Sequence, residues 1–186
     1  DGVNQSVCTF TLTVEDQTAP TATAQNITVA LDIDGYAEVA INDIDAGSSD
    51  NCGAIIKSLN TTIFTCDEIG QNEIILTITD QGGLQSTATA IVTVVDTMAP
   101  QVVCQDITLI LDENGQVNIT PQDIDAGSTD NCGIVSYSID ATSFDCSSSG
   151  QNFVTLTVTD ASGNTNSCTT SVTIIDQTAP TLTCLE

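Results

Sequence analysis

An eleven-residue segment rich in carboxylates occurs twice in the chain, and it constrains the fold more than any other feature. Residues 43–53 read DIDAGSSDNCG and residues 123–133 read DIDAGSTDNCG. Asp16, Asp96 and Asp176 each begin a D-x-x-A-P segment, so these motifs recur with the same 80-residue spacing. A fixed period is typical of repeat proteins. The sequence therefore predicts two full repeats, 16–95 and 96–175. Residues 1–15 are expected to be the C-terminal strand of a preceding repeat, and 176–186 a linker with the start of a following one.

Each repeat alternates apolar and polar residues over short segments bounded by turn residues, which predicts β-strands. In the first repeat the expected strands are 26–31, 37–41, 54–59, 73–79 and 87–95. Asp34-Gly35 is typical of a hairpin turn, and Thr120-Pro121 in the second repeat favours a single helical turn. About seven antiparallel strands in each repeat predict an all-β chain of tandem immunoglobulin-like β-sandwiches.

Charge and composition exclude several classes of partner. The 186 residues include 25 Asp and Glu but one cation, Lys57, for a formal charge of −24. Nucleic acid and anionic membrane surfaces would be repelled. No stretch approaches the roughly 20 apolar residues of a membrane span, so direct membrane insertion is not expected. Because 40% of the residues are hydrophobic, the chain is expected to fold, with the carboxylates in loops where divalent cations offset their repulsion.

The carboxylates of each repeat are expected to meet at one pole of the sandwich. The first strand starts at the pole where the linker arrives, so the strand that returns from it delivers the acidic loop there. The strand before the last also ends at this pole and brings Asp80, or Asp160 in the second repeat, with it. Calcium prefers such clustered oxygen ligands. The predicted structural Ca²⁺ ligands are Asp16, Asp43, Asp45, Asp50, Asn51 and Asp80 in one repeat, and Asp96, Asp123, Asp125, Asp130, Asn131 and Asp160 in the other. The alternative is that these residues only build turns, with Asp80 and Asp160 capping the turns that follow them.

The eight cysteines, with no histidine, indicate disulfides in an oxidising, extracellular setting rather than zinc or haem sites. The first repeat has alanines, Ala24 and Ala88, at the positions of Cys104 and Cys168. Two cysteines lost together suggest a bonded pair, since one left alone is reactive. The predicted disulfides are Cys104–Cys168, Cys52–Cys66 and Cys132–Cys146, with Cys168–Cys184 as a rival pairing. Cys8 and Cys184 are expected to lack partners.

Enzymatic chemistry has little support in the sequence. Without histidine there is no serine or cysteine nucleophile with a histidine base, and one lysine cannot form a cationic clamp on a phosphate. Paired carboxylates could hydrolyse glycosides. However, two Tyr and four Phe provide few aromatic platforms for sugars. The chain is expected not to be an enzyme.

The motifs together resemble a known family. D-x-T-A-P or D-T-M-A-P, then CQDIT, DNCG and VTDASGN, are similar to HYR-like (hyalin-type) repeats of giant cell-surface proteins of Bacteroidetes such as flavobacteria, most fully over 96–180. The resemblance implies an immunoglobulin-like fold and a role in cell adhesion or surface filaments, with export by the type IX system. The linker also resembles the calcium-bearing junction of cadherins, as an analogy.

The main hypothesis is a structural spacer or stalk of a long extracellular adhesin or surface filament. Calcium would rigidify each junction between neighbouring repeats of the chain, and disulfides each domain. One alternative is a calcium-dependent module that binds a glycan or another cell-surface ligand, although such ligands could instead bind other parts of the parent protein. Another is a self-assembling filament subunit in which a terminal strand completes a neighbour.

Overall fold

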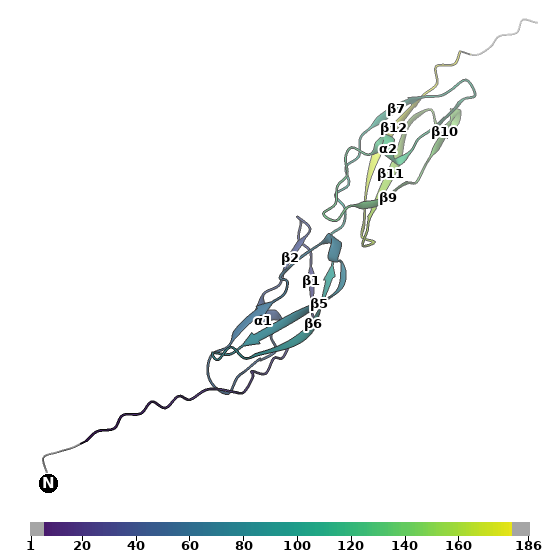
Figure 1. The fold of residues 1–186 in the computed structure, drawn as a ribbon. Helices are drawn as coiled ribbons and strands as arrows, with labels where there is room; N and C mark the ends of the chain where they lie inside the picture. Colours follow the sequence, from purple (N-terminus) through teal and green to yellow (C-terminus); the bar gives the residue numbers. More distant parts are fainter. Residues whose placement is uncertain (1–5, 180–186) are drawn as a thin grey trace, which may run out of the picture. The chain divides into compact units, whose positions relative to one another are not determined.

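The computed structural model describes residues 6–179, and almost all of its regular structure is β (Figure 1). Two compact units make up the chain. The first comprises Asp1–Val29, Glu38–Ile63 and Gly70–Thr93, and the second comprises Ala30–Ala37, Phe64–Ile69 and Val94–Glu186. The repeat boundaries at 16, 96 and 176 stay predictions. Residues 6–19 have no regular secondary structure, while residues 1–5 and 180–186, including Cys184, lie outside the described residues.

The first set of strands forms a four-stranded and a two-stranded sheet. The larger sheet has the order β1 (Ile27–Ala30), β6 (Gln85–Val95), β5 (Gly70–Thr79) and β3 (Ile56–Leu59). The smaller pairs β2 (Tyr36–Glu38) with β4 (Ile63–Thr65). From Ile74 to the end of β5 every second residue is buried, as expected for a strand with one face on a core. Ile74, Leu76 and Ile78 provide that face.

The second set repeats this arrangement. Its larger sheet has the order β7 (Ile107–Ile110), β12 (Thr165–Ile175), β11 (Gly150–Asp160) and β9 (Ile134–Ile139), and its smaller sheet pairs β8 (Gln116–Asn118) with β10 (Ser143–Asp145). Phe144, Val154, Leu156, Val158 and Val172 are among the residues that pack into one core. The predicted all-β sandwich architecture is therefore confirmed. One detail differs from the prediction, because β7 pairs with β12 in parallel. These are the first and last strands, so the long chain between them allows a parallel pair.

Short helices lead into each acidic loop. The predicted turn at Thr120-Pro121 is helix α2 (Pro121–Ile124), with Pro121 at a first-turn position that suits its fixed φ. Its counterpart α1 (Ile41–Ile44) was not predicted, since Ile41 carries no such signal. Two three-residue 3₁₀ turns, η1 (Cys66–Glu68) and η2 (Cys146–Ser148), follow β4 and β10. Among the described residues no helix is long and apolar enough to cross a membrane.

Candidate metal centres

Three aspartates from distant segments meet in each unit. In the second unit they are Asp96 directly after β6, Asp130 in the acidic loop, and Asp160 at the end of β11. One carboxylate oxygen from each lies within 4.8 Å of the others. Asp16, Asp50 and Asp80 form the same group in the first unit. We call these the second and the first carboxylate group. Each contains one residue from a linker, one from a loop and one from a strand end, as the strand directions predicted.

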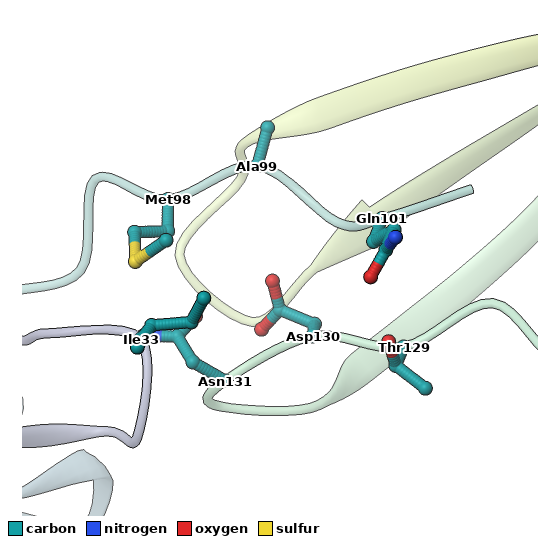
Figure 2. Close-up of a pocket in the computed structure, with 7 residues that line it drawn as sticks. All are labelled: Ile33, Met98, Ala99, Gln101, Thr129, Asp130 and Asn131. Atoms are coloured by element: carbon teal, nitrogen blue, oxygen red, sulfur yellow. The ribbon is translucent and has the colours of Figure 1, made fainter.

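Local hydrogen bonds fix the orientation of these carboxylates. In the second group, the Cys132 amide donates to Asp130 Oδ1 at 2.9 Å, and the Met98 amide donates to Asp96 Oδ1 at 3.0 Å. Figure 2 shows Asp130 on the loop that faces the linker residues Met98 and Ala99. Asp160 Oδ1 accepts the amides of Ser162 and Asn164, so this residue does cap its turn. In Asp96 and Asp130 the other oxygen of the same carboxylate is left free to face the group, whereas Asp160 Oδ2 accepts the side-chain amide of Asn164.

Several of those other oxygens are buried without a partner. Among the described residues, Oδ2 of Asp96 and Oδ2 of Asp130 accept no hydrogen bond and have almost no accessible surface. The same is true of Asp50 Oδ1 and Asp80 Oδ2 in the first group. Asp80, Asp96 and Asp160 are 4%, 6% and 1% exposed. A buried anionic oxygen without a partner is costly, and here several carboxylates of like charge share one site. A bound cation would offset this repulsion and give the unpartnered oxygens a partner.

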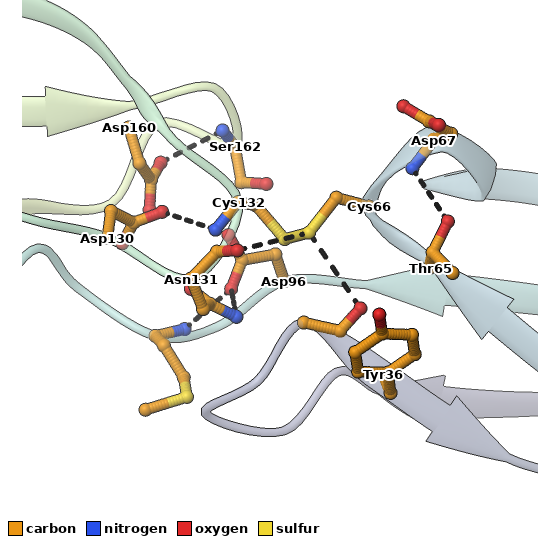
Figure 3. Close-up of a disulfide and its surroundings, with 12 residues drawn as sticks. Tyr36, Thr65, Cys66, Asp67, Asp96, Asp130, Asn131, Cys132, Asp160 and Ser162 are labelled. Atoms are coloured by element: carbon orange, nitrogen blue, oxygen red, sulfur yellow. Dashed lines mark hydrogen bonds between the residues drawn. A yellow bond between two sulfur atoms is a disulfide. The ribbon is translucent and has the colours of Figure 1, made fainter.

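The asparagine of each acidic loop differs between the two units. The side-chain amide of Asn131 donates to Asp32 O at 3.0 Å and to Asp96 Oδ1 at 3.4 Å, and its Oδ1 is buried without a partner. Asn131 therefore lies at the edge of the second group (Figure 3). Asn51 is exposed, and its amide donates to the sulfur of Cys52. The structure places Asn131, but not Asn51, where an oxygen ligand could be offered.

Asp43 and Asp123 are predicted as ligands, but the structure places neither of them in a carboxylate group. Each carboxylate accepts the backbone amide that starts its short helix, from Ala40 at 3.2 Å and from Thr120 at 2.6 Å. The amide and hydroxyl of Thr120 hold the pKa of Asp123 below its ordinary value. Both residues are helix caps.

Asp45 and Asp125, also predicted as ligands, likewise lie outside both carboxylate groups. Asp45 accepts the Ser48 amide and pairs with Lys57, the only cation of the chain. The bond from Lys57, with the bond from the Ser48 hydroxyl second, lowers the pKa of Asp45 to about 2. Asp125 accepts both the amide and the hydroxyl of Ser128. These side chains brace the acidic loop internally and belong to neither carboxylate group.

Asn164 is a functional residue that the ligand prediction missed. Its side-chain amide donates to Asp160 Oδ2 at 2.8 Å and to the backbone oxygens of Asp96 and Met98, both at 3.2 Å. It thus ties the turn after β11 to the linker. The signal for it was the S-G-N sequence that follows Asp160, whereas the first repeat has Leu84 at this position.

The disulfides agree with the prediction in one pair and correct it in the others. Cys104 and Cys168 are bonded, with Cα atoms 6.1 Å apart. Cys66 is bonded to Cys132, 66 residues away, so neither Cys52–Cys66 nor Cys132–Cys146 forms (Figure 3). The reason is geometric. η1 places Cys66 against the loop that contains Cys132, whereas Cys52 lies near Asp16 of the first carboxylate group. Partial desolvation, and after it the negative charge of Asp16, raises the pKa of the Cys52 thiol.

One comparison of sequence finds a similar domain family. Residues 95–174 match the model of the HYR domain. The HYR domain is an immunoglobulin-like, extracellular adhesion module. The match covers the whole second carboxylate group and the Cys104–Cys168 bond. No curated protein matches the chain.

The solved structures to which the chain is similar include cadherin fragments. Human protocadherin-24 EC1-2 is 12% identical over 87% of this chain and 100% of its own, with a TM-score of 0.44. Drosophila N-cadherin EC1-4 is 12% identical over 85% of this chain and 50% of its own, with a TM-score of 0.46. Mouse cadherin-23 EC22-24 is 14% identical over 86% of this chain and 65% of its own, with a TM-score of 0.40. Similarity at this level supports no conclusion about function.

Proposed function

We propose that the chain is a spacer of a long extracellular adhesin or surface filament, in which each carboxylate group binds one structural Ca²⁺. The HYR match over 95–174 supports the extracellular, adhesion-type setting. The calcium proposal depends on a single observation: unpartnered, buried carboxylate oxygens converge in both units. The Bacteroidetes source, the type IX route, glycan binding and strand exchange stay predictions from the sequence.

The geometry of the groups suits calcium. Ligand oxygens lie about 2.4 Å from Ca²⁺, so two oxygens on opposite sides of one ion are about 4.8 Å apart. The oxygens of each group all lie within 4.8 Å of one another. Asp130 and Asp96 each direct one oxygen to the group while a backbone amide holds the other, which orients the ligand in advance. Calcium takes six to eight oxygens, so backbone carbonyls, Asn131 Oδ1 or water would complete the shell.

An ion in the second group would act mechanically. Asp96 belongs to the linker, while Asp130 and Asp160 belong to a loop and a strand end of the repeat that the linker enters. Binding all three carboxylates would clamp the linker onto that repeat. Linkers between domains otherwise flex, so the binding free energy would hold the direction in which the chain enters each repeat.

Calcium binding and its mechanical effect can be tested together. Isothermal titration calorimetry on chelator-treated chain should detect about two ions per chain with a Kd of roughly 0.1–1 mM, the range of extracellular calcium modules. Small-angle scattering should give a longer and narrower distance distribution with calcium than with EDTA.

A matched control is available in Asp145. Its Oδ1 accepts the Ser147 amide at 2.9 Å, as Asp130 Oδ1 accepts the Cys132 amide, but Asp145 lies in neither group. Asp145→Asn should leave the stoichiometry unchanged, whereas Asp130→Asn should remove one ion. Scattering curves that superimpose with and without calcium would refute the spacer mechanism, and a titration without heat would refute the metal site.

A further inference from the structure

Two exposed thiols stand at the repeat positions of a bonded pair. Cys66 and Cys132 form a disulfide, while Cys146 and Cys52, which occupy the same positions in the other repeat, are free and exposed. Cys66 belongs to the sequence of the first repeat and Cys132 to that of the second, so this bond joins consecutive repeats along the chain. Cys146 therefore corresponds to Cys66, and Cys52 corresponds to Cys132.

The surroundings of Cys146 reproduce those of Cys66. Each opens a 3₁₀ turn after a short strand, and each sulfur lies against the glycine of a hairpin: Cys66 is 3.9 Å from Gly35 O and Cys146 is 3.7 Å from Gly115 O. Both glycines have positive φ, 77° and 74°, and a Cβ on either would lie within 3 Å of the sulfur. Because only glycine allows so close an approach, both hairpins are built to receive a cysteine at this place.

The loop of Cys52 reproduces the loop of Cys132. Residues 50–53 and 130–133 have the same sequence, DNCG. In both loops the cysteine amide donates to the aspartate two residues earlier, at 2.8 Å for Cys52 and 2.9 Å for Cys132. The two loops therefore share the hydrogen bond that holds the backbone of the cysteine.

Three cavities lie at these positions. One is lined by a hairpin, a linker and an acidic loop, and each of the other two lacks one of these elements. The complete one, of about 180 Å³, is lined by hairpin residue Ile33, linker residues Met98 and Ala99, and loop residues Asp130 and Asn131 (Figure 2). A second, of about 560 Å³, has the hairpin and linker at the matching positions and is lined by Cys146, but no acidic loop contributes to it: Glu113, Asn114, Gly115, Cys146, Asp176, Thr178 and Ala179. A third, of about 310 Å³, has the linker and loop without a hairpin: Thr18, Ala19, Thr21, Ser49, Asp50 and Asn51.

We infer that Cys146 forms a disulfide with the cysteine in the DNCG loop of another repeat of this type. Cys52, which lies in such a loop, would form the same kind of disulfide with a cysteine at the position of Cys146 in another repeat. The Cys66–Cys132 bond is an example of such a disulfide. The cavity at Cys146 contains every element of the Cys66 side except the loop, and the loop sequence that fits it is present at 50–53. Successive repeats would then be joined by one bond per junction. This inference extends the spacer role but requires no ion.

The chemistry needs a disulfide oxidant, as expected outside the cell. The Cys146 thiolate attacks a glutathione disulfide, forms a mixed disulfide and releases one glutathione thiolate. The loop cysteine thiolate then attacks the sulfur of Cys146 and releases the second. Two protein thiols are oxidised, and one glutathione disulfide is reduced to two glutathiones.

The test places a second loop next to Cys146. A copy of residues 16–95 is inserted between Ile175 and Asp176 of the full chain, and the original Cys52 is replaced by Ser. After refolding in a glutathione redox buffer with EDTA, a non-reducing digest should yield a peptide that links Cys146 to the inserted copy of Cys52. In a matched variant whose inserted Cys52 is also Ser, Cys146 should be alkylated. Retention of the Cys104–Cys168 peptide in both confirms that the second repeat has folded.

A second measurement uses the chain without an insertion. A peptide with the sequence of residues 128–134, activated as a mixed disulfide with thionitrobenzoate, should modify Cys146 about tenfold faster than a scrambled peptide does, which corresponds to about 1.4 kcal/mol of recognition. Equal rates would overturn the inference. So would an inserted chain in which Cys146 stays alkylatable or pairs with Cys8 or the inserted Cys66. Because EDTA is present, these results are independent of whether the carboxylate groups bind calcium.

Discussion

Asp130→Asn should change the stability of the protein in opposite directions with and without calcium. Asp130 Oδ1 accepts the Cys132 amide, and Oδ2 is buried beside Asp96 and Asp160 without a partner. An Asn can keep the first bond with its own Oδ1. Its NH₂ group then replaces the unpartnered oxygen and can donate to the two remaining carboxylates. Without metal the substitution removes repulsion and adds hydrogen bonds, and with metal it removes a ligand.

The magnitude follows from the separation of the charges. Two like charges 4.8 Å apart repel by about 3 kcal/mol at an effective dielectric constant of about 20. Asp130 is only half-buried, so water and small displacements reduce this value. We expect the variant to gain about 2 kcal/mol in EDTA, equivalent to a rise of roughly 10 °C in Tm for a domain of this size. Calcium at 10 to 100 times its Kd stabilises the wild-type site by about 1.4–2.7 kcal/mol, and the variant should lose this gain.

Thermal unfolding followed by circular dichroism, in EDTA and in 10 mM calcium, measures both effects. Asp50→Asn should behave in the same way in the first group, since its Oδ1 is likewise buried without a partner. Asp145→Asn should show the wild-type response to calcium. If Asp130→Asn is no more stable than wild type in EDTA and still gains stability from calcium, the carboxylates are not under mutual repulsion and do not form the site.

Three further variants test the remaining contacts. Lys57→Met should cost about 1 kcal/mol, since it removes the main cause of the low pKa of Asp45. Because that folded-state pKa of about 2 is below the ordinary 3.8, the difference from wild type should be complete above about pH 4 and disappear as the pH falls to 2, as measured by urea unfolding. Replacing Cys104 and Cys168 with Ala, as in the first repeat, should cost about 4 kcal/mol in the chain-entropy model, and an unchanged midpoint in urea would contradict it. Gly35→Ala should lower the stability by at least about 1 kcal/mol, because φ is 77° and the new Cβ would lie 2.9 Å from a disulfide sulfur.

The fold was predictable from the sequence because its signals are local or periodic. Alternation along residues 73–79 and 87–95 predicted β5 and β6, and Pro121 predicted α2. The parallel pairing of β7 with β12 was not predictable in this way. Alternation shows which residues face a core, but two strands that are distant in the sequence carry no local signal of their direction relative to each other.

The carboxylate groups were predictable only in part, for a chemical reason. Strand direction correctly brought Asp16, Asp50 and Asp80 to one place. It could not separate Asp43 and Asp45 from them, because an aspartate that caps a helix and one that binds a metal look alike in a sequence. Only the hydrogen bonds distinguish them. The cap at Asp43 uses its oxygen on a backbone amide at the start of α1, whereas Asp50 and Asp80 keep one buried oxygen unpartnered.

Comparison of the two repeats predicts one disulfide but not the partners of the remaining cysteines. Paired replacement by Ala identified Cys104–Cys168, but the other two cysteines are present in both repeats, so nothing in the sequence indicated their partners. The expected 14-residue spacing and the observed separation of 66 add up to one 80-residue period. In a repeat protein, a cysteine can therefore pair with a partner in its own repeat or with the same position one repeat further on, and the sequence alone gives both choices equal support.

The bond between Cys66 and Cys132 also bears on the second carboxylate group, because Asp130, Asn131 and Cys132 are consecutive. The Cys132 amide holds the Asp130 carboxylate, and the sulfur of the same residue is bonded to η1. The bond therefore restricts the loop that supplies one carboxylate, and a restricted ligand loses less entropy when an ion binds. In the first group the corresponding Cys52 is free, so its loop lacks this restriction. The second group should consequently bind calcium more tightly than the first, and reduction of the disulfides should bring the two affinities together. If calorimetry finds two equal affinities in the oxidised chain, the bond does not preorganise the loop.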